Sequence, residues 1–289
     1  LGLDKLLSEN GIGGPFDDFE GIFSDIACDS TKAGLCASIE KKVFDYFASL
    51  KLPDTPTLYD HLILSLRPKD VIATFNWDPF LWQAAARNYK FGQAPMLLFL
   101  HGNVAIGYCS VCKLVLRRGE VCDRCGHPSC GSPLLYPVKQ KDYQTDPLIA
   151  ADWRAIGNAL KVAWAVTFFG YGAPKTDVEA VNLLKRGWGD TGDRNLEETE
   201  IIDIRPESEL DRTWSPFIHT HHRVIRRSFY DSYLAKHPRR SGEALWARLM
   251  ECQFVKGAKF PSTADFTELY EWLKPRIDAE WANDSSQES

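Results

Sequence analysis

The sequence lacks any uninterrupted apolar run near the roughly 20 residues that a membrane-spanning helix needs. It also lacks a basic-then-apolar leader at its start, which favours a cytoplasmic protein without membrane contact. Its net charge of −5 means that any contact with nucleic acid must come from a local basic patch. With 44% hydrophobic and 25% charged residues among 289, the chain has the composition of a folded protein with a substantial core.

One local basic patch is present between residues 219 and 240. Its basic residues are His219, His221, His222, Arg223, Arg226, Arg227, Lys236, Arg239 and Arg240. We interpret the patch as the exposed face of a helix, because runs of charge usually face solvent. A nucleic-acid or partner contact, and a metal site formed by the histidines, stay open as alternatives.

The eight cysteines are unevenly distributed, and five are clustered: Cys109, Cys112, Cys122, Cys125 and Cys130. The first four form two Cys-x2-Cys pairs separated by nine residues, and two such pairs can converge on one tetrahedral Zn²⁺. Cys130 leaves the ligand set open, because it could replace Cys122 or Cys125. Four thiolates leave no open coordination position, so we expect a structural zinc ribbon.

Short apolar strands alternate with helices through the middle of the chain. The predicted strands cover 70–75, 96–102, 164–172 and 199–204, and the predicted helices cover 56–66, 79–89, 147–163 and 176–187. Two further helices are predicted within residues 16–50. Strands that are apolar throughout and alternate with helices predict an α/β fold, in which helices cover both faces of a parallel, Rossmann-like sheet.

This pattern divides the chain into four parts. They are a first Rossmann-like segment (1–104), a zinc-ribbon insertion (105–137), a second Rossmann-like segment (138–205) and a C-terminal helical extension (206–289).

Each predicted strand ends in polar residues or glycine. These residues are Thr74, Asn76 and Asp78, then His101, then Gly170 and Tyr171, and finally Asp203. Because the carboxyl ends of parallel strands meet at one edge of a sheet, we expect one crevice there. The alternative is that Asn76 and Asp78 cap the helix that follows and that His101 is structural.

The motifs "TFNWD", "LHG", the cysteine ribbon and "FFGYGAPKTDVEAV" resemble, in this order, those of the sirtuin (silent information regulator) superfamily. The resemblance is closest to its prokaryotic branch, whose members often cleave NAD in antiphage defence. It implies a sirtuin-type sheet and NAD as the substrate. It also implies that Asn76, His101 and Asp78 are catalytic, and that Thr74, Gly170, Tyr171 and Asp177 bind NAD.

The roles that the resemblance implies suit these side chains. Cleavage of the nicotinamide–ribose bond builds positive charge on the sugar. Asp78 would hold the nicotinamide amide, Asn76 would position a water molecule or the ribose hydroxyls, and His101 would accept a proton. Trp77 and Tyr171 would exclude solvent. Asp203 would bind the adenosine ribose, although an acidic strand end without this role stays an alternative.

Two features of this sequence depart from the sirtuin pattern. Sirtuins have a first strand and a glycine-rich loop that bind the pyrophosphate at a helix N-terminus. We find neither before residue 16, so we expect the chain to begin downstream of them and the sheet to lack a central strand. The Phe-Gly-Glu segment of deacetylating sirtuins is replaced by "LLYPVKQKDY" at 134–143, which argues against an acyl-lysine channel.

We therefore expect an NAD hydrolase that yields ADP-ribose and nicotinamide. Two other functions stay open: an NAD-dependent protein deacylase, and a non-catalytic module that binds a nucleotide or a partner. A homo-oligomer or an activating partner is compatible with each of them.

Overall fold

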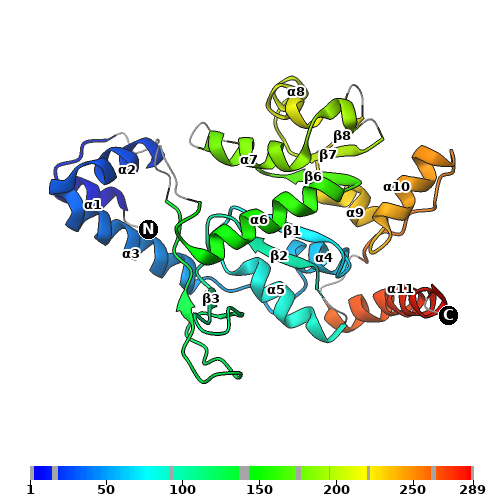
Figure 1. The fold of residues 1–289 in the computed structure, drawn as a ribbon, viewed down its shortest axis with the longest axis horizontal. Coiled ribbons are helices and arrows are strands. Elements are labelled where there is room, and N and C mark those ends of the chain that lie inside the picture. Colours follow the sequence, from blue (N-terminus) through cyan, green and yellow to red (C-terminus); the bar gives the residue numbers. More distant parts are fainter. Residues whose placement is uncertain are drawn as a thin grey trace.

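The computed structural model describes residues 3–14, 19–91, 94–136, 143–173, 177–194, 196–219, 222–261 and 265–287. Parallel strands alternate with helices along the middle of the chain, so the predicted α/β class is confirmed (Figure 1). None of the helices in these ranges combines the length and apolar character that a membrane span requires.

The N-terminal part is a helical unit at one end of the molecule (Figure 1). It contains α1 (Leu3–Glu9), α2 (Phe19–Cys28) and α3 (Ala33–Ser49). These helices enclose their own core of Leu7, Phe23, Ile26, Ile39 and Val43. Residues 3–14 form α1 and a turn, and they contribute no strand, as the sequence predicted.

A first pair of parallel strands joins β1 (Val71–Thr74) to β2 (Met96–Phe99). The helices next to these strands are α4 (Leu58–Leu64) and α5 (Phe80–Asn88). Successive residues of β1 pack into different clusters, since Ile72 contacts the α4–α5 cluster and Ala73 contacts the α6 cluster. Both faces of this half-sheet are therefore covered, as a parallel sheet requires.

A second half-sheet has the order β6-β7-β8 and is also parallel. Its strands are β6 (Ala165–Phe169), β7 (Glu198–Ile202) and β8 (Arg223–Arg226). The helices α6 (Pro147–Val162) and α7 (Val178–Trp188) pack against it through a shared apolar cluster. Every residue of β7 is buried, which places this strand at the centre of the half-sheet.

Residues 223–226 of the basic patch form the strand β8, and Lys236 ends the short helix α9, so the expected single exposed helix face was wrong. Arg223 of β8 forms ion pairs with Asp211 and with Glu207 (3.1 Å), and Arg226 lies 3.6 Å from Glu200. These acidic partners offset the charge that made the segment look solvent-exposed. His221 lies outside the described residues.

The remaining C-terminal elements are helical. They are α8 (Glu207–Trp214), α9 (Tyr233–Lys236), α10 (Ser241–Met250) and α11 (Phe266–Gln287). The 3₁₀ turns of the described chain are η1 (Ser30–Lys32), η2 (Tyr89–Phe91), η4 (Thr191–Asp193), η5 (Ser215–Phe217) and η6 (Phe229–Asp231). The cysteine segment forms a small antiparallel sheet, in the order β4 (Val115–Arg117), β3 (Ile106–Tyr108), β5 (Cys130–Gly131).

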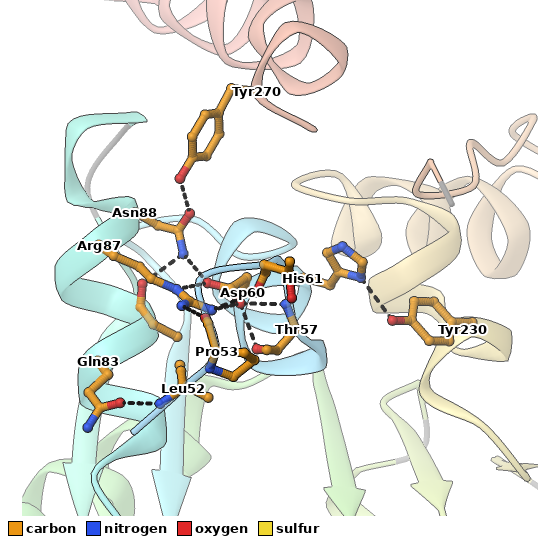
Figure 2. Close-up of polar contacts among 12 residues, drawn as sticks. Leu52, Pro53, Thr57, Asp60, His61, Gln83, Arg87, Asn88, Tyr230 and Tyr270 are labelled. Carbon is orange, nitrogen blue, oxygen red and sulfur yellow. Dashed lines mark hydrogen bonds and ion pairs between the residues drawn. The ribbon is translucent and has the colours of Figure 1, made fainter. Parts of the chain in front are cut away.

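A buried carboxylate, Asp60, ties α11 to the body of the fold (Figure 2). It accepts hydrogen bonds from the Thr57 backbone N–H (2.7 Å), Asn88 Nδ2 (2.8 Å) and Arg87 Nε (2.6 Å). The Asn88 amide oxygen in turn accepts a hydrogen bond from the Tyr270 hydroxyl of α11 at 2.9 Å. Because removal of one partner would leave a buried charge uncompensated, this network fixes α4, α5 and α11 together.

Candidate functional site

Four cysteines of the insertion converge on one point. The Sγ atoms of Cys109, Cys112, Cys122 and Cys125 all lie within 4.8 Å of one another. The hydrogen bond from the Cys112 backbone N–H lowers the pKa of Cys109 to about 6, whereas hydrogen bonding to Cys125 raises the pKa of Cys112. The convergence of the four sulfur atoms, rather than their pKa values, indicates the metal site. Cys130 is exposed on β5 and outside this group. The four-sulfur set therefore fits one tetrahedral ion, and the structure favours these four ligands.

The loop after β1 carries Thr74, Asn76 and Asp78. Thr74 Oγ1 accepts a hydrogen bond from the Asn76 backbone N–H at 3.1 Å, and Asp78 Oδ1 accepts one from the Phe80 N–H at 3.0 Å. Asp78 thus stabilises the start of α5, which is the contact expected from the capping alternative. Burial raises the pKa of Asp78, while hydrogen bonds from Phe80 and Asn76 oppose this effect.

A buried asparagine joins this loop to the loop after β2. Asn103 Nδ2 donates to the carbonyl oxygen of Asp78 at 2.6 Å, and Asn103 Oδ1 accepts from the Ala105 N–H at 2.9 Å. The Val104 N–H donates to the Trp77 carbonyl at 3.0 Å. The two strand ends are therefore fixed relative to each other. Asn103 directly follows the predicted strand 96–102, but nothing in its sequence surroundings indicates this connecting role.

His101, at the end of β2, lies in a group of polar side chains from three parts of the chain. Its Nε2 atom is 3.4 Å from the Tyr143 hydroxyl and 3.9 Å from Asp177 Oδ1. The Tyr171 hydroxyl donates to the other carboxylate oxygen of Asp177 at 2.9 Å. Asp177 therefore connects His101 to Tyr171, and the structure brings three of the predicted site residues together.

Tyr143 is a member of this group that the sequence did not predict. It follows the polar run "VKQKD", where nothing indicates a buried residue, yet it is 4% exposed. Its burial raises its pKa, so the hydroxyl keeps its proton and can donate to the His101 imidazole. The Trp153 ring packs at 4.9 Å against it and holds it in place.

An aromatic pair separates His101 from the nearby cavity. The Phe75 ring stacks on Tyr171 with centroids 4.1 Å apart and approaches His101 edge-on at 4.8 Å. A cavity of about 950 Å³ lies beside this pair. The predicted residues that line it are Thr74, Asn76, Asp78, Gly170 and Tyr171. His101 is 5% exposed and lies behind the pair.

The backbone conformation of Gly170 sets the direction in which the chain leaves β6. Its φ of +62° is a left-handed conformation that residues with a Cβ adopt at a cost, and its N–H still donates to the Ile202 carbonyl at 2.9 Å. The chain can therefore leave the sheet sharply and place Tyr171 over Phe75.

Asp203 and Trp77 each make defined contacts within the protein. Asp203 accepts hydrogen bonds from Arg205 Nε (3.1 Å) and Nη2 (2.8 Å), and it is not among the cavity residues. Although burial raises the pKa of Asp203, the bonds from Arg205 outweigh this effect and lower it. Trp77 packs on Phe47 of α3 and on Tyr136, which follows the cysteine insertion, with the Tyr136 ring centroid 5.0 Å away.

Comparison with solved structures finds sirtuin (Sir2) enzymes. A Sir2 homologue in complex with NAD is 14% identical with a TM-score of 0.41, covering 83% of this chain and 87% of that one. A structure on sirtuin substrate affinity is 16% identical with a TM-score of 0.39, covering 76% and 84%. No protein-family model and no curated protein matches. These neighbours come from the family that the motifs resemble, but they are too distant to assign a function.

Proposed function

We propose that this chain carries the catalytic groups of an NAD hydrolase, which releases nicotinamide and ADP-ribose. One observation supports this proposal most directly. The ends of β1, β2 and β6 lie together, and the His101–Asp177–Tyr171 group lies next to a cavity lined by Asn76 and Asp78. The carboxyl edge of a parallel sheet is where such folds bind nucleotides.

In the proposed reaction, the oxygen of a water molecule bonds to the ribose carbon that carried nicotinamide. Nicotinamide leaves with the bonding electrons, and one proton is released from the water. His101 is the group that accepts this proton, directly or through a ribose hydroxyl. The Asp177 carboxylate, 3.9 Å from Nε2, stabilises the imidazolium that results.

The two polar residues of the β1 loop would position the substrate. Asn76 is exposed at the cavity, where its amide can hold the attacking water. Asp78 is half-buried, and its carboxylate can accept a hydrogen bond from the nicotinamide amide. Because His101 is 5% exposed behind Phe75, we infer that the Phe75–Tyr171 pair moves when the substrate binds.

The test follows nicotinamide release from NAD by chromatography, for the full chain and for Asn76→Ala and His101→Ala. Loss of a catalytic group should reduce turnover by about a hundredfold or more without a large change in melting temperature. Asn158→Ala, at an exposed position of α6, and His237→Ala, before α10, are matched controls that should keep activity. If both site variants keep full activity, the site is wrong.

The same assay separates the other functions. Nicotinamide release that requires an acyl-lysine peptide would establish a deacylase. NAD binding by calorimetry without turnover, also after addition of cell extract to supply an activator, would indicate a non-catalytic module. A cytoplasmic role in antiphage defence would require that His101→Ala abolishes protection of infected cells.

A further inference from the structure

A second cavity, of about 400 Å³, lies between α11 and the segments on either side of α10. None of its lining residues lines the cavity of about 950 Å³ beside the strand ends. Figure 1 places α9, α10 and α11 at the end of the molecule away from the N-terminal helical unit. Its charged lining residues are one carboxylate, Glu280, and the cations Arg67, Lys236, Arg240, Lys256 and Arg276. In a chain of net charge −5, this is a local concentration of positive charge.

The one carboxylate of this lining is already bound by an arginine that does not line the cavity. Arg239 Nε donates to Glu280 Oε1 at 2.7 Å, and Arg239 Nη2 donates to Glu280 Oε2 at 2.7 Å. This bidentate pair is buried and uses both carboxylate oxygens. Arg67 Nε lies 3.6 Å from Glu280, and Arg67 Nη2 pairs at 2.8 Å with Glu243, outside the cavity lining. Glu280 therefore leaves most of the positive charge uncompensated.

Three of the lining cations, Arg240, Lys256 and Arg276, have no acidic partner in the part of the chain that the structure describes. The Arg276 guanidinium instead stacks over the Trp272 ring at 3.9 Å and donates to the Trp272 carbonyl at 2.6 Å. Lys236 lies 3.9 Å from an exposed carboxylate, that of Asp231. The arginine of α11 is thus held in position, and its charge stays available to an anion.

The nearby titration of His237 reflects the same concentration of charge. Burial lowers the pKa of His237, and the charges of Lys236 and Arg240 lower it further. The neighbouring cations therefore act on one another across this cavity, and an added anion would relieve their repulsion.

The backbone around the cavity is held by tight contacts. The Ala258 N–H donates to the Lys236 carbonyl at 2.7 Å, which fixes the loop before α11 against α9. A Cβ at Gly257 would lie 3.2 Å from the same carbonyl, so this approach leaves little room for a side chain. The Arg239 N–H donates to the Ser65 carbonyl at 2.6 Å, with a left-handed φ of +65° at Arg239. The concave shape is therefore built by the fold.

The shape and chemistry of the cavity favour a small phosphorylated molecule. Guanidinium groups match the geometry of phosphate oxygens, and about 400 Å³ is within the range of small-molecule sites. A nucleic-acid interface would instead spread its cations along an extended face. Here the cations converge on one hollow, where Pro238 and Glu280 are buried. The remaining lining is apolar and consists of Pro238, Val255, Ala258, Pro275 and Ala279.

We propose that this cavity binds a small molecule that carries a chain of phosphate groups, either an inorganic oligophosphate or a nucleoside triphosphate. The phosphate chain would lie among Arg240, Lys256 and Arg276, and the apolar residues would contact any group that the chain carries. Because these cations come from both sides of α10 and from α11, the ligand would connect the C-terminal helices. The site shares no lining residue with the strand-end cavity, so the proposal does not depend on the proposed function.

The experiment measures binding by calorimetry to the full chain, at about 50 mM salt, where charge interactions are weakly screened. The ligands are sodium triphosphate, ATP without magnesium, and a single-stranded DNA of about 20 nucleotides. The test variant is Arg240→Gln with Lys256→Gln, because both side chains are exposed and line the cavity. The matched control is Lys161→Gln with Lys185→Gln, which removes the same charge from exposed positions of α6 and α7 outside the cavity.

We expect triphosphate and ATP each to bind the parent at this site with a stoichiometry of about one. The test variant should bind both at least about tenfold more weakly, and the control should stay within about twofold of the parent. Equal affinities for the two ligands would support the proposal and assign binding to the phosphate chain alone. Tighter binding of ATP would also support it and show that the nucleoside contacts the apolar residues.

A second measurement uses the parent protein alone, so it does not depend on the folding of a variant. Saturating triphosphate should slow amide exchange of residues 255–258 by at least about threefold, because the ligand would hold this loop against α9. Four results would each overturn the proposal. They are no binding of either phosphate compound at about 1 mM, equal affinity of the test variant and the parent, unchanged exchange at saturation, and binding of the DNA alone.

Discussion

The cysteine cluster and the strand-end site are built in different ways. The sulfur atoms of the cluster come from one short segment, and Cys109 and Cys125, 3.4 Å apart, are separated by 16 positions. At the strand ends, the pairs in contact are far apart in sequence: Tyr143 lies 42 positions from His101. The cysteine cluster therefore follows from local spacing in the sequence, whereas the strand-end site exists only when the whole sheet has formed.

The largest expected effect is loss of the metal from the locally built cysteine cluster. Replacing one of the four sulfur ligands, as in Cys112→Ser, should reduce bound zinc from about one equivalent to below about 0.1, because structural zinc sites form together with their metal. The insertion should become sensitive to proteolysis between residues 105 and 136. The measurement is elemental analysis of protein purified without chelator, combined with limited proteolysis.

Cys130→Ser is the matched control, because Cys130 is exposed and outside the sulfur cluster. It should keep its metal. Equal loss of zinc from both variants would show that the assignment of the four ligands is wrong.

The sequence predicted most of the fold where local pattern decides it. The runs that became β1, β2 and β6 are largely apolar, so the parallel α/β class could be recognised. The strand β7 was also predicted, although it contains Glu198 and Glu200. The strand β8 was missed because Arg223 and Arg226 stand at its two ends. Their acidic partners, such as Asp211 and Glu200, come from other elements, and no local pattern reveals them.

The candidate site at the strand ends could also be predicted only where a local motif marks its residues. Motif order pointed to His101, Tyr171 and Asp177, and the structure brings them into contact. The roles of Tyr143 and Asn103 depend on contacts across the fold, so their surroundings in the sequence carry no signal. Which residues touch substrate stays a prediction.

A second test addresses the long-range contact at the strand ends. Under the proposed function, Asp177 is a positioning residue, because its carboxylate orients and stabilises the His101 imidazole. Asp177→Asn should reduce kcat by about a hundredfold to a thousandfold, since an amide cannot stabilise the imidazolium in the same way. The Michaelis constant for NAD should change little, and the melting temperature should stay close to that of the parent.

Glu179→Gln is the control for this variant, because Glu179 is exposed in the first turn of the same helix, α7. It should leave kcat unchanged. If Asp177→Asn raises the Michaelis constant with kcat unchanged, Asp177 binds NAD directly, as the motif resemblance implied.

The smallest expected effect concerns a buried carboxylate that is hydrogen-bonded to the end of β2. Asp152 of α6 accepts a hydrogen bond from the Phe99 N–H at 2.7 Å, across 53 positions of sequence. Burial raises the pKa of Asp152 from 3.8 to about 6, although the bond from Phe99 opposes this effect. Between these values the folded protein binds more protons at Asp152 than the unfolded chain does.

The contribution of Asp152 to stability therefore falls by about 2–3 kcal/mol as the pH rises from about 4 to about 6.5. Asp152→Asn removes the titrating group while its amide oxygen can still accept from Phe99. The variant should gain about 2–3 kcal/mol relative to the parent between about pH 4 and pH 7, as measured by urea unfolding. Glu179→Gln should follow the pH curve of the parent. Parallel curves for Asp152→Asn and the parent would show that Asp152 keeps an ordinary pKa, and that its hydrogen bond to β2 fully offsets its burial.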